Sequence, residues 1–265
     1  MTNDSVLLEE QVDGLLTLTL NRPERRNALN GELSERLTDA VARAARDAGV
    51  RAVLLRGSGG TFCVGGDVRA MADGAERDAT FEQRVQALRR RTETVRLLHE
   101  MPKPTVALIE GAAAGAGLSI ALACDFRIAG ERAKITTAFA KVGLSGDYGG
   151  TYMLTKLLGS AKARDLYINS PTLSGREARD LGLIHRVADD AEVADAASQW
   201  ARKLASGPTV TFGYMKQAIN LAEGAPFAAV LDLEATNHIR CTSTHDHKEA
   251  ASAFVQKRSP VFGGH

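Results

Sequence analysis

The chain has 265 residues, of which 44% are hydrophobic and 25% are charged, and its net charge is +1. Such a composition is typical of a globular chain with one large domain or a domain with an appendage. The balanced charge argues against general binding of nucleic acid or of an anionic membrane. No apolar run approaches the roughly 20 residues that cross a bilayer, and the N-terminus lacks the features of a secretion signal. We therefore expect a cytoplasmic protein without a nucleic-acid or membrane partner.

Three cysteines, Cys63, Cys124 and Cys241, lie in distant segments. An odd number in this distribution favours reduced, buried thiols over a disulfide framework. For Cys63, which lies in a glycine-rich turn, packing is favoured over catalysis. The spacing of Cys241, His245 and His247 matches no standard zinc pattern, so we predict no metal site.

Short apolar runs that end in turn signals predict strands, and stripes of apolar residues predict helices between them. The first stripe runs from Leu33 to Ala44 and the second from Phe81 to Leu98. Alternating strands and helices indicate an α/β fold, but this pattern alone does not distinguish a doubly wound sheet from other α/β arrangements. The predicted strands are Leu15–Leu20, Ala52–Leu55, Thr105–Ile109 and Phe126–Ala129.

Ser174 and Glu177 form a capping-box pattern that predicts a helix over Arg176–Leu181, ended by Gly182. After Ala191 the strand signal fades and three or four helical stretches follow. We therefore predict two regions, a core over residues 1–190 and a helical region over 191–265. The apolar faces of that region could not close a core alone, so they should pack on the core or on a neighbouring subunit.

Two glycine-rich turns, Thr61–Asp67 and Gly111–Ser119, each follow a predicted strand. Either turn alone is explained by close packing of the backbone. Together, their outward N–H groups could converge on one point and bind the oxygen of a thioester carbonyl as it gains negative charge. The pair therefore indicates an oxyanion hole.

With this pair of turns the chain resembles the crotonase superfamily, also called the enoyl-CoA hydratase/isomerase family. The resemblance implies a spiral of ββα units followed by helices that build trimers, commonly paired into hexamers. It also implies an acyl-CoA substrate, with coenzyme A as part of that substrate and no further cofactor. The matching segments are Asn21–Pro23, Asn27–Leu29, Phe62–Asp67, Lys103–Pro104, Gly111–Asp125, Gly143–Leu144, Gly149–Thr151, Gly182–Ile184 and Phe254–Phe262.

The resemblance assigns the two oxyanion donors to the backbone N–H groups of Gly66 and Ala116. Many relatives have glycine at the second position, but alanine still has the N–H group, so the oxyanion hole survives if the backbone conformation of Ala116 is compatible. Asp67 is interpreted as structural, capping the following turn, with a catalytic acid as the alternative. The two glutamates that activate water in hydratases fall at Ser119 and Phe139, so ordinary hydratase activity is poorly supported.

An acid remains at Asp147, in a glycine-rich turn before an apolar helix. In the isomerases of the resembled family an aspartate here shuttles a proton, and the alternative is an N-cap for the helix. A dehalogenase branch uses this aspartate as a nucleophile together with a histidine where this chain has Thr92, so that branch is disfavoured.

Contacts with substrate are expected from the arginine-rich loop around Arg26, from both turns, from the helix after Phe81, and from the C-terminal end of a neighbouring subunit. A solvated basic loop is the alternative for each arginine. The residues expected to contact substrate are Arg26, Ala28, Val64, Gly65, Asp67, Met71, Ser119, Phe139, Leu144, Tyr148, Lys257 and Phe262.

The leading hypothesis is an acyl-CoA isomerase with Gly66, Ala116 and Asp147 as its catalytic groups, acting on a 3-enoyl-CoA or on a ring-containing acyl-CoA. One alternative is a hydratase that takes its carboxylates from Asp147 with Asp67 or Glu110. The other is a family member that binds acyl-CoA without catalysis.

Overall fold

A six-stranded β-sheet forms the centre of the molecule in the computed structural model, which describes residues 5–67 and 79–265. The strands lie in the order β1-β2-β3-β4-β6-β8, with β1 antiparallel to β2 and all other neighbours parallel. Parallel neighbours need crossover connections, and helices supply them here. The strands are β1 (Leu7–Val12), β2 (Leu15–Leu20), β3 (Ala52–Gly57), β4 (Thr105–Ile109), β6 (Phe126–Gly130) and β8 (Arg186–Ala188).

A second, two-stranded parallel sheet is formed by β5 (Ala112–Ala114) and β7 (Lys134–Thr136). Because β5 begins three residues after β4 ends, the chain leaves the large sheet at Gly111 and enters the small one at once. Gly111 has a φ of +59°, and a Cβ there would lie 2.2 Å from the Gly60 carbonyl oxygen. Glycine is therefore required at this corner.

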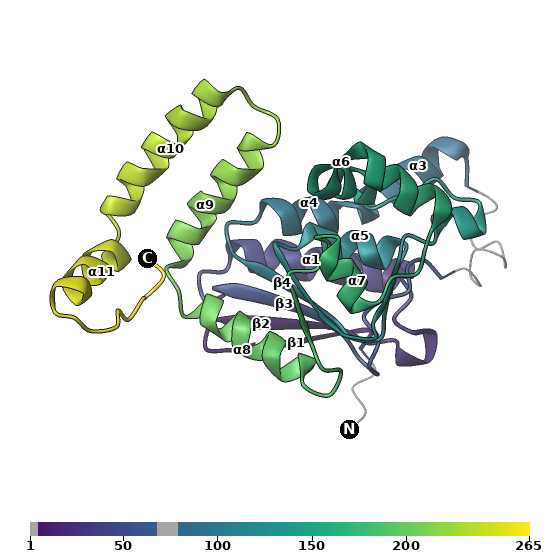
Figure 1. Cartoon of the computed structure of the whole chain (residues 1–265), viewed down its shortest axis with the longest axis horizontal. Coiled ribbons are helices and arrows are strands. Elements are labelled where there is room, and N and C mark those ends of the chain that lie inside the picture. Colours follow the sequence, from purple (N-terminus) through teal and green to yellow (C-terminus); the bar gives the residue numbers. More distant parts are fainter. Residues whose placement is uncertain (1–4, 68–78) are drawn as a thin grey trace.

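Helices cover both faces of the large sheet (Figure 1). Alternation of side chains along the strands separates the two cores. Leu54 and Leu108 pack with Trp200 of α8 on one face, whereas Leu55 and Ile109 belong to the core on the opposite face, with α1, α4 and α5. The helices are η1 (Pro23–Arg25), α1 (Gly31–Arg46), α3 (Phe81–Arg91), α4 (Glu93–Glu100), α5 (Ala116–Ala123), η2 (Phe139–Val142), α6 (Gly150–Asn169), α7 (Gly175–Asp180), α8 (Val193–Ala205), α9 (Thr209–Ala222), α10 (Phe227–Thr242) and α11 (His245–Val255).

The four predicted strands are present, and so are the helix from the first apolar stripe and the helix with the capping box. In the last of these, Ser174 accepts a hydrogen bond from the Glu177 N–H group and the Glu177 side chain bonds back to Ser174. Among the described helices, none combines the length and the apolar content needed to span a membrane.

The second apolar stripe does not form one buried face, which corrects the prediction from its spacing. The chain divides at Thr92 into α3 and α4, and only α4 buries its apolar residues, Val95 and Leu98. On α3, Phe81 and Val85 are exposed, and none of its described residues is buried. Periodicity predicts a face, but it does not say whether another element covers that face.

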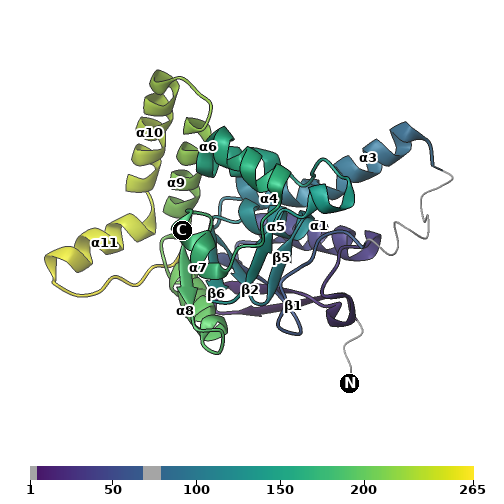
Figure 2. The same cartoon turned by 45° about the vertical axis from the view of Figure 1, so that its right-hand side comes forward.

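The last three helices project from the core as an arm, with α9 and α10 side by side (Figures 1 and 2). The predicted boundary at residue 191 assigns α8 to this helical region, whereas Val193, Ala197 and Trp200 of α8 pack on the large sheet. Of the helices after residue 191, α8 thus packs on the large sheet, α9 contacts α4 through a hydrogen bond from Lys216 to the Leu98 carbonyl, and α10 and α11 extend away from the core.

Candidate active site

The two glycine-rich turns lie side by side. Cys63 pairs with Ala113 of β5 in a parallel bridge, in which the Cys63 N–H group donates to Ala112 and the Ala114 N–H group donates to Cys63. Behind this bridge, a Cβ on Gly117 would lie 2.3 Å from the Cys63 carbonyl oxygen, so glycine is needed there for the turns to approach. Burial raises the pKa of the Cys63 thiol to about 12, which keeps it protonated and suits a packing residue.

The closest approach of the turns is between Gly65 and the start of α5. Gly65 has a φ of +90°, and a Cβ on it would lie 3.2 Å from the Ala116 nitrogen and 2.9 Å from the Ala114 carbonyl oxygen. The backbone conformation of Gly115, with φ of 52° and ψ of −129°, would be strained for any residue with a side chain. These two glycines let the backbones meet without intervening side chains.

The N–H groups of Gly66 and Ala116 flank this meeting point. Leu29 donates to the Gly65 carbonyl and accepts from the Asp67 N–H group, so the Gly66 N–H group points to the opposite side, where β5 and α5 lie. Ala116 is the first residue of α5, where N–H groups have no partner within the helix. Within the described residues, neither group makes a hydrogen bond. The positive end of the α5 dipole adds to their attraction for a negative oxygen.

The segment Asn21–Leu29 supports the first turn from behind. Asn27 is fully buried, and its side-chain amide donates to the carbonyls of Ser58, at 2.9 Å, and Thr61, at 2.6 Å. Its φ of +56° lies in the left-handed region, where asparagine is tolerated better than most residues. Asparagine suits position 27 because its short side chain has two N–H donors, which bind the Ser58 carbonyl and the Thr61 carbonyl of the first turn.

Asp67 forms an ion pair with Arg22, with 3.3 Å between Oδ2 and Nη2. Arg22 also donates to the Ala28 carbonyl, so it ties the Asn27 loop to the end of the first turn. The turn after Asp67 lies outside the described residues, and so does Met71. The other carboxylate considered for a hydratase, Glu110, is paired with Arg56 at 3.3 Å.

The two positions at which hydratases have glutamates, Ser119 and Phe139, are both buried. Ser119 lies one helical turn after Ala116 on α5, and its hydroxyl donates a long hydrogen bond, 3.3 Å, to the Gly115 carbonyl. Phe139 begins η2, and a Cβ on Gly115 would lie 3.8 Å from its ring. A hydroxyl and an aromatic ring therefore stand beside the donors, in place of two carboxylates.

Asp147 lies in the loop between η2 and α6, and burial raises the pKa of its carboxyl to about 6. Its Oδ1 atom is buried and has no hydrogen-bond partner among the described residues. The alternative interpretation of Asp147 as a helix cap is wrong, because α6 begins after Gly149 and no side chain caps it. A carboxyl of raised pKa without a structural partner suits proton transfer near neutral pH.

Tyr148 connects this loop to α1. It is buried with a φ of +49°, and its hydroxyl lies 3.3 Å from the Ser34 hydroxyl. This contact ties the residue that follows Asp147 to α1.

The other residues expected to contact substrate lie in separate parts of the fold. The Arg26 carbonyl accepts from the Val64 N–H group at 3.3 Å, so the arginine-rich loop lies against the first turn. Leu144 is exposed on the Asp147 loop. Lys257 and Phe262 lie in the C-terminal arm region, where the Phe262 carbonyl accepts from Arg51, and their expected contact from a neighbouring subunit remains a prediction.

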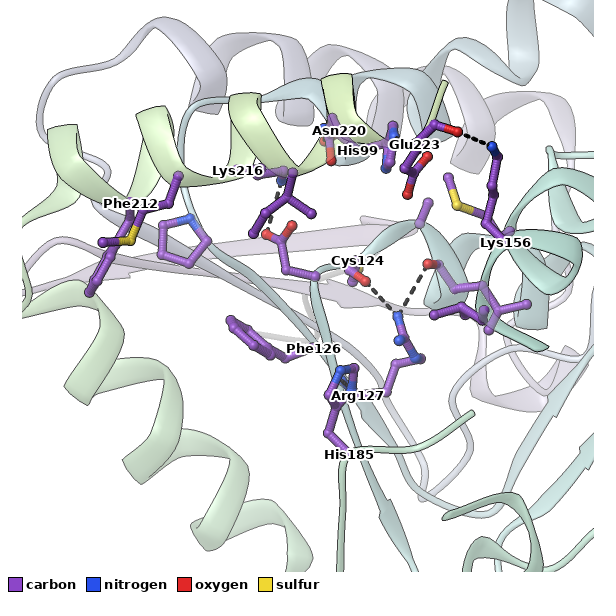
Figure 3. A pocket seen from close by; sticks show the side chains of 18 of the residues that line it. His99, Cys124, Phe126, Arg127, Lys156, His185, Phe212, Lys216, Asn220 and Glu223 are labelled. Carbon is purple, nitrogen blue, oxygen red and sulfur yellow. Dashed lines mark hydrogen bonds and ion pairs between the residues drawn. The ribbon is translucent and has the colours of Figure 1, made fainter. Parts of the chain in front are cut away.

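A cavity of about 440 Å³ separates α9 from the sheet (Figure 3). Its charged groups already have partners, because Lys216 pairs with Asp125 at 2.9 Å and Arg127 donates to the carbonyls of Cys124 and Leu183. Burial lowers the pKa of His185 in this cavity to about 4, so the imidazole is neutral at pH 7. Neither turn nor the Asp147 loop lines it, so the candidate active site lies elsewhere.

Comparison with known proteins identifies the family and the fold. The family model described as enoyl-CoA hydratase/isomerase matches residues 10–265. The chain belongs to this family. It has the crotonase fold: a putative enoyl-CoA hydratase from Streptomyces coelicolor superposes with a TM-score of 0.94 at 35% identity, over 100% of this chain and 97% of that one. The predicted superfamily and fold are therefore confirmed.

Curated members of the enoyl-CoA hydratase/isomerase family with related sequences carry different activities in their names. The chain is 40% identical to 1,2-epoxyphenylacetyl-CoA isomerase of Escherichia coli, over 97% of this chain and 98% of that protein. It is 36% identical to a probable enoyl-CoA hydratase of Rhodobacter capsulatus, over 95% of each. Acyl-CoA chemistry is common to both names, whereas the reaction differs.

Two contributions to the site were missed by the sequence analysis. Arg22 belongs to the arginine-rich loop that is expected at the substrate, but it is the ion-pair partner of Asp67, 45 residues away. Tyr167, on α6, packs beside the Asp147 loop and Phe139. No local pattern signals either contact, because each joins segments that meet only in the folded chain.

Proposed function

We propose that this protein is an acyl-CoA isomerase in which Asp147 moves a proton while the N–H groups of Gly66 and Ala116 hold the enolate oxygen. The observation that supports this most strongly is the Asp147 carboxyl, partly buried, unpaired at Oδ1 among the described residues, and shifted toward neutral pKa. Ser119 and Phe139 at the glutamate positions agree with a reaction that needs one carboxylate and not two.

The chemistry follows from these groups. Asp147 removes a proton from a carbon near the thioester carbonyl, and the electron pair of the broken C–H bond moves through the conjugated system onto the carbonyl oxygen. Two backbone donors and the α5 N-terminus stabilise that oxygen. Asp147 then returns the proton to a different carbon while the electron pair leaves the oxygen and the carbonyl re-forms, so a double bond of the chain or of the ring changes position with no net gain or loss of atoms.

The acyl group is either a 3-enoyl chain or a ring, and the name of the Escherichia coli relative favours the ring. The hydratase alternative is supported by the name of the Rhodobacter relative. It needs a second carboxylate, and the candidates Asp67 and Glu110 are each held in an arginine ion pair. We therefore rank it second.

The test is product analysis with purified protein on three thioesters: 3-hexenoyl-CoA, a ring-epoxide acyl-CoA and crotonyl-CoA. We expect 2-hexenoyl-CoA, a rearranged ring, or both, with little 3-hydroxybutyryl-CoA from crotonyl-CoA. Dominant hydration of crotonyl-CoA would favour the hydratase. Binding of all three thioesters without turnover would favour a non-catalytic member of the family.

We also propose that α9 to α11 form a subunit interface in a homotrimer or a dimer of trimers. Large apolar side chains of these helices are exposed in the single chain, including Ile219 at 66%, Phe227 at 77% and Phe254 at 85%. A soluble monomer rarely exposes so much apolar surface on one arm. Light scattering of the full chain should give the mass of three or six copies, and a monomer at micromolar concentration would contradict the proposal.

A further inference from the structure

Tyr167 packs against glycines on both sides of Asp147, namely Gly146 and Gly150. A Cβ on Gly146 would lie 2.7 Å from its ring atom Cε1, and a Cβ on Gly150 would lie 2.7 Å from its hydroxyl oxygen. The ring is also parallel to that of Phe139, with centroids 5.9 Å apart and planes 9° apart. Glycines on both sides of Asp147 therefore make room for this one tyrosine.

The hydroxyl of Tyr167 has no hydrogen-bond partner among the described residues, although its oxygen is buried. The Thr151 side chain lowers the pKa of Tyr167 and so opposes the effect of burial, but its contact with the hydroxyl does not have the geometry of a hydrogen bond. A buried hydroxyl without a hydrogen-bond partner destabilises the fold, so it needs an explanation. The Asp147 carboxyl, which has the same property at Oδ1, follows Gly146 directly.

A third polar group is near. A Cβ on Gly150 would lie 2.4 Å from the Ser119 hydroxyl oxygen, which brings this atom to within about 5 Å of the Tyr167 hydroxyl. Ser119 lies one turn from Ala116, so the cluster of Ser119, Asp147 and Tyr167 adjoins the oxyanion donors. Burial, and secondarily the charge of Asp147, raises the pKa of Tyr167, so the phenol stays protonated and remains a donor at neutral pH.

We propose that Tyr167 is a specificity-determining residue whose hydroxyl donates a hydrogen bond to an oxygen atom on the acyl group of the substrate, beside Asp147. The inference rests on the proposed function, since it takes the acyl group to lie between the oxyanion donors and Asp147. A purely hydrocarbon acyl group would cover the phenol and leave its donor unpaired, whereas an ether, epoxide or hydroxyl oxygen would satisfy it. The substrate class is then an oxygen-bearing acyl-CoA.

Equilibrium binding by calorimetry tests this without requiring turnover. The probes are cyclohexylacetyl-CoA and its three tetrahydropyranylacetyl-CoA analogues, in which one ring CH₂ group at position 2, 3 or 4 is replaced by oxygen. We expect at least one ether to bind the unmodified protein about tenfold more tightly than cyclohexylacetyl-CoA does. Tyr167→Phe, which keeps the ring and its stacking on Phe139, should abolish that preference.

The matched control is Tyr152→Phe, because Tyr152 also lies in α6, before its kink at Gly159, but its hydroxyl bonds to Glu223, the C-cap residue of α9. This variant should keep the ether preference. Equal affinity for all four probes, as expected if a water molecule satisfies the phenol, would overturn the inference, and so would a preference that survives Tyr167→Phe. An ether preference without isomerase activity would refute the proposed function alone, and failure of every probe to bind would refute both.

Discussion

The pair of glycine turns and the Asp147 loop serve the same candidate site, but they are held in opposite ways. The turns are fixed by backbone hydrogen bonds, by glycines at Gly65 and Gly115, and by the buried Asn27. In the Asp147 loop, by contrast, a carboxyl oxygen and the neighbouring Tyr167 hydroxyl are buried without partners among the described residues.

This difference follows from what each part supplies. The turns supply backbone N–H groups, which any residue except proline provides, so their function depends on backbone shape. The loop supplies one side chain, whose function depends on its pKa and therefore on its surroundings. Substitutions should accordingly affect the two regions through different observables.

The largest effect is expected for Asp147→Asn. The amide keeps the shape of the side chain but cannot accept the proton, so isomerisation should fall by about 10² to 10⁴. Acyl-CoA affinity should change little and the melting temperature should not fall, because the carboxyl caps no helix and the substitution removes a partly buried charge. Steady-state kinetics with calorimetry and thermal melting measure the three quantities. A variant with full activity on every substrate of the parent would remove Asp147 from the mechanism.

A slightly smaller effect is expected for Ala116→Pro, which removes one oxyanion donor. Proline is well tolerated at the first position of a helix, where Ala116 lies, so the fold should survive while kcat falls by about 10² to 10³. His245→Pro makes the same change at the first position of α11 and should leave kcat within twofold. Unchanged turnover in a folded Ala116→Pro protein would exclude this N–H group.

Asn27→Ala should affect stability more than chemistry. It leaves the carbonyls of Ser58 and Thr61 without their donor, and it puts alanine at a positive φ, so unfolding free energy should fall by about 2 to 3 kcal/mol. Urea denaturation measures the change. Ser145→Ala, at an exposed position of the Asp147 loop, should stay within about 0.5 kcal/mol and serves as the control. Equal effects of the two substitutions would refute the contrast between the regions.

The smallest expected effect is the change of kcat/KM with pH. Burial raises the pKa of Asp147 to about 6, so the base is lost by protonation as pH falls through 6, and kcat/KM should drop about tenfold per pH unit below it. The linked stability has the opposite sign: a raised carboxyl pKa favours folding at low pH, and this contribution is lost as pH rises through 6. A kcat/KM profile that is flat between pH 5 and 7 would contradict the assignment.

The sequence by itself determined the α/β class, four of the strands, the two glycine turns and the family. These features depend on local periodicity, on glycine at positive φ, and on a motif such as Asn27–Leu29 that occurs as a contiguous unit. Asp147 could also be singled out, because it lies within such a motif. The alternative role as a helix cap could not be rejected, since that required the position at which α6 begins.

Only the tertiary structure decided which groups are paired and which are not. Arg22 and Asp67, 45 residues apart, meet because the Asn27 loop packs behind the first turn, and Tyr167 reaches Gly146 because α6 folds back over its own loop. The sequence also could not predict that the apolar face of α3 is exposed, because apolar spacing does not reveal whether another element covers a face. Burial and pairing depend on segments that are distant in the chain. They determine the pKa of Asp147, and they leave the Tyr167 hydroxyl without a hydrogen-bond partner among the described residues.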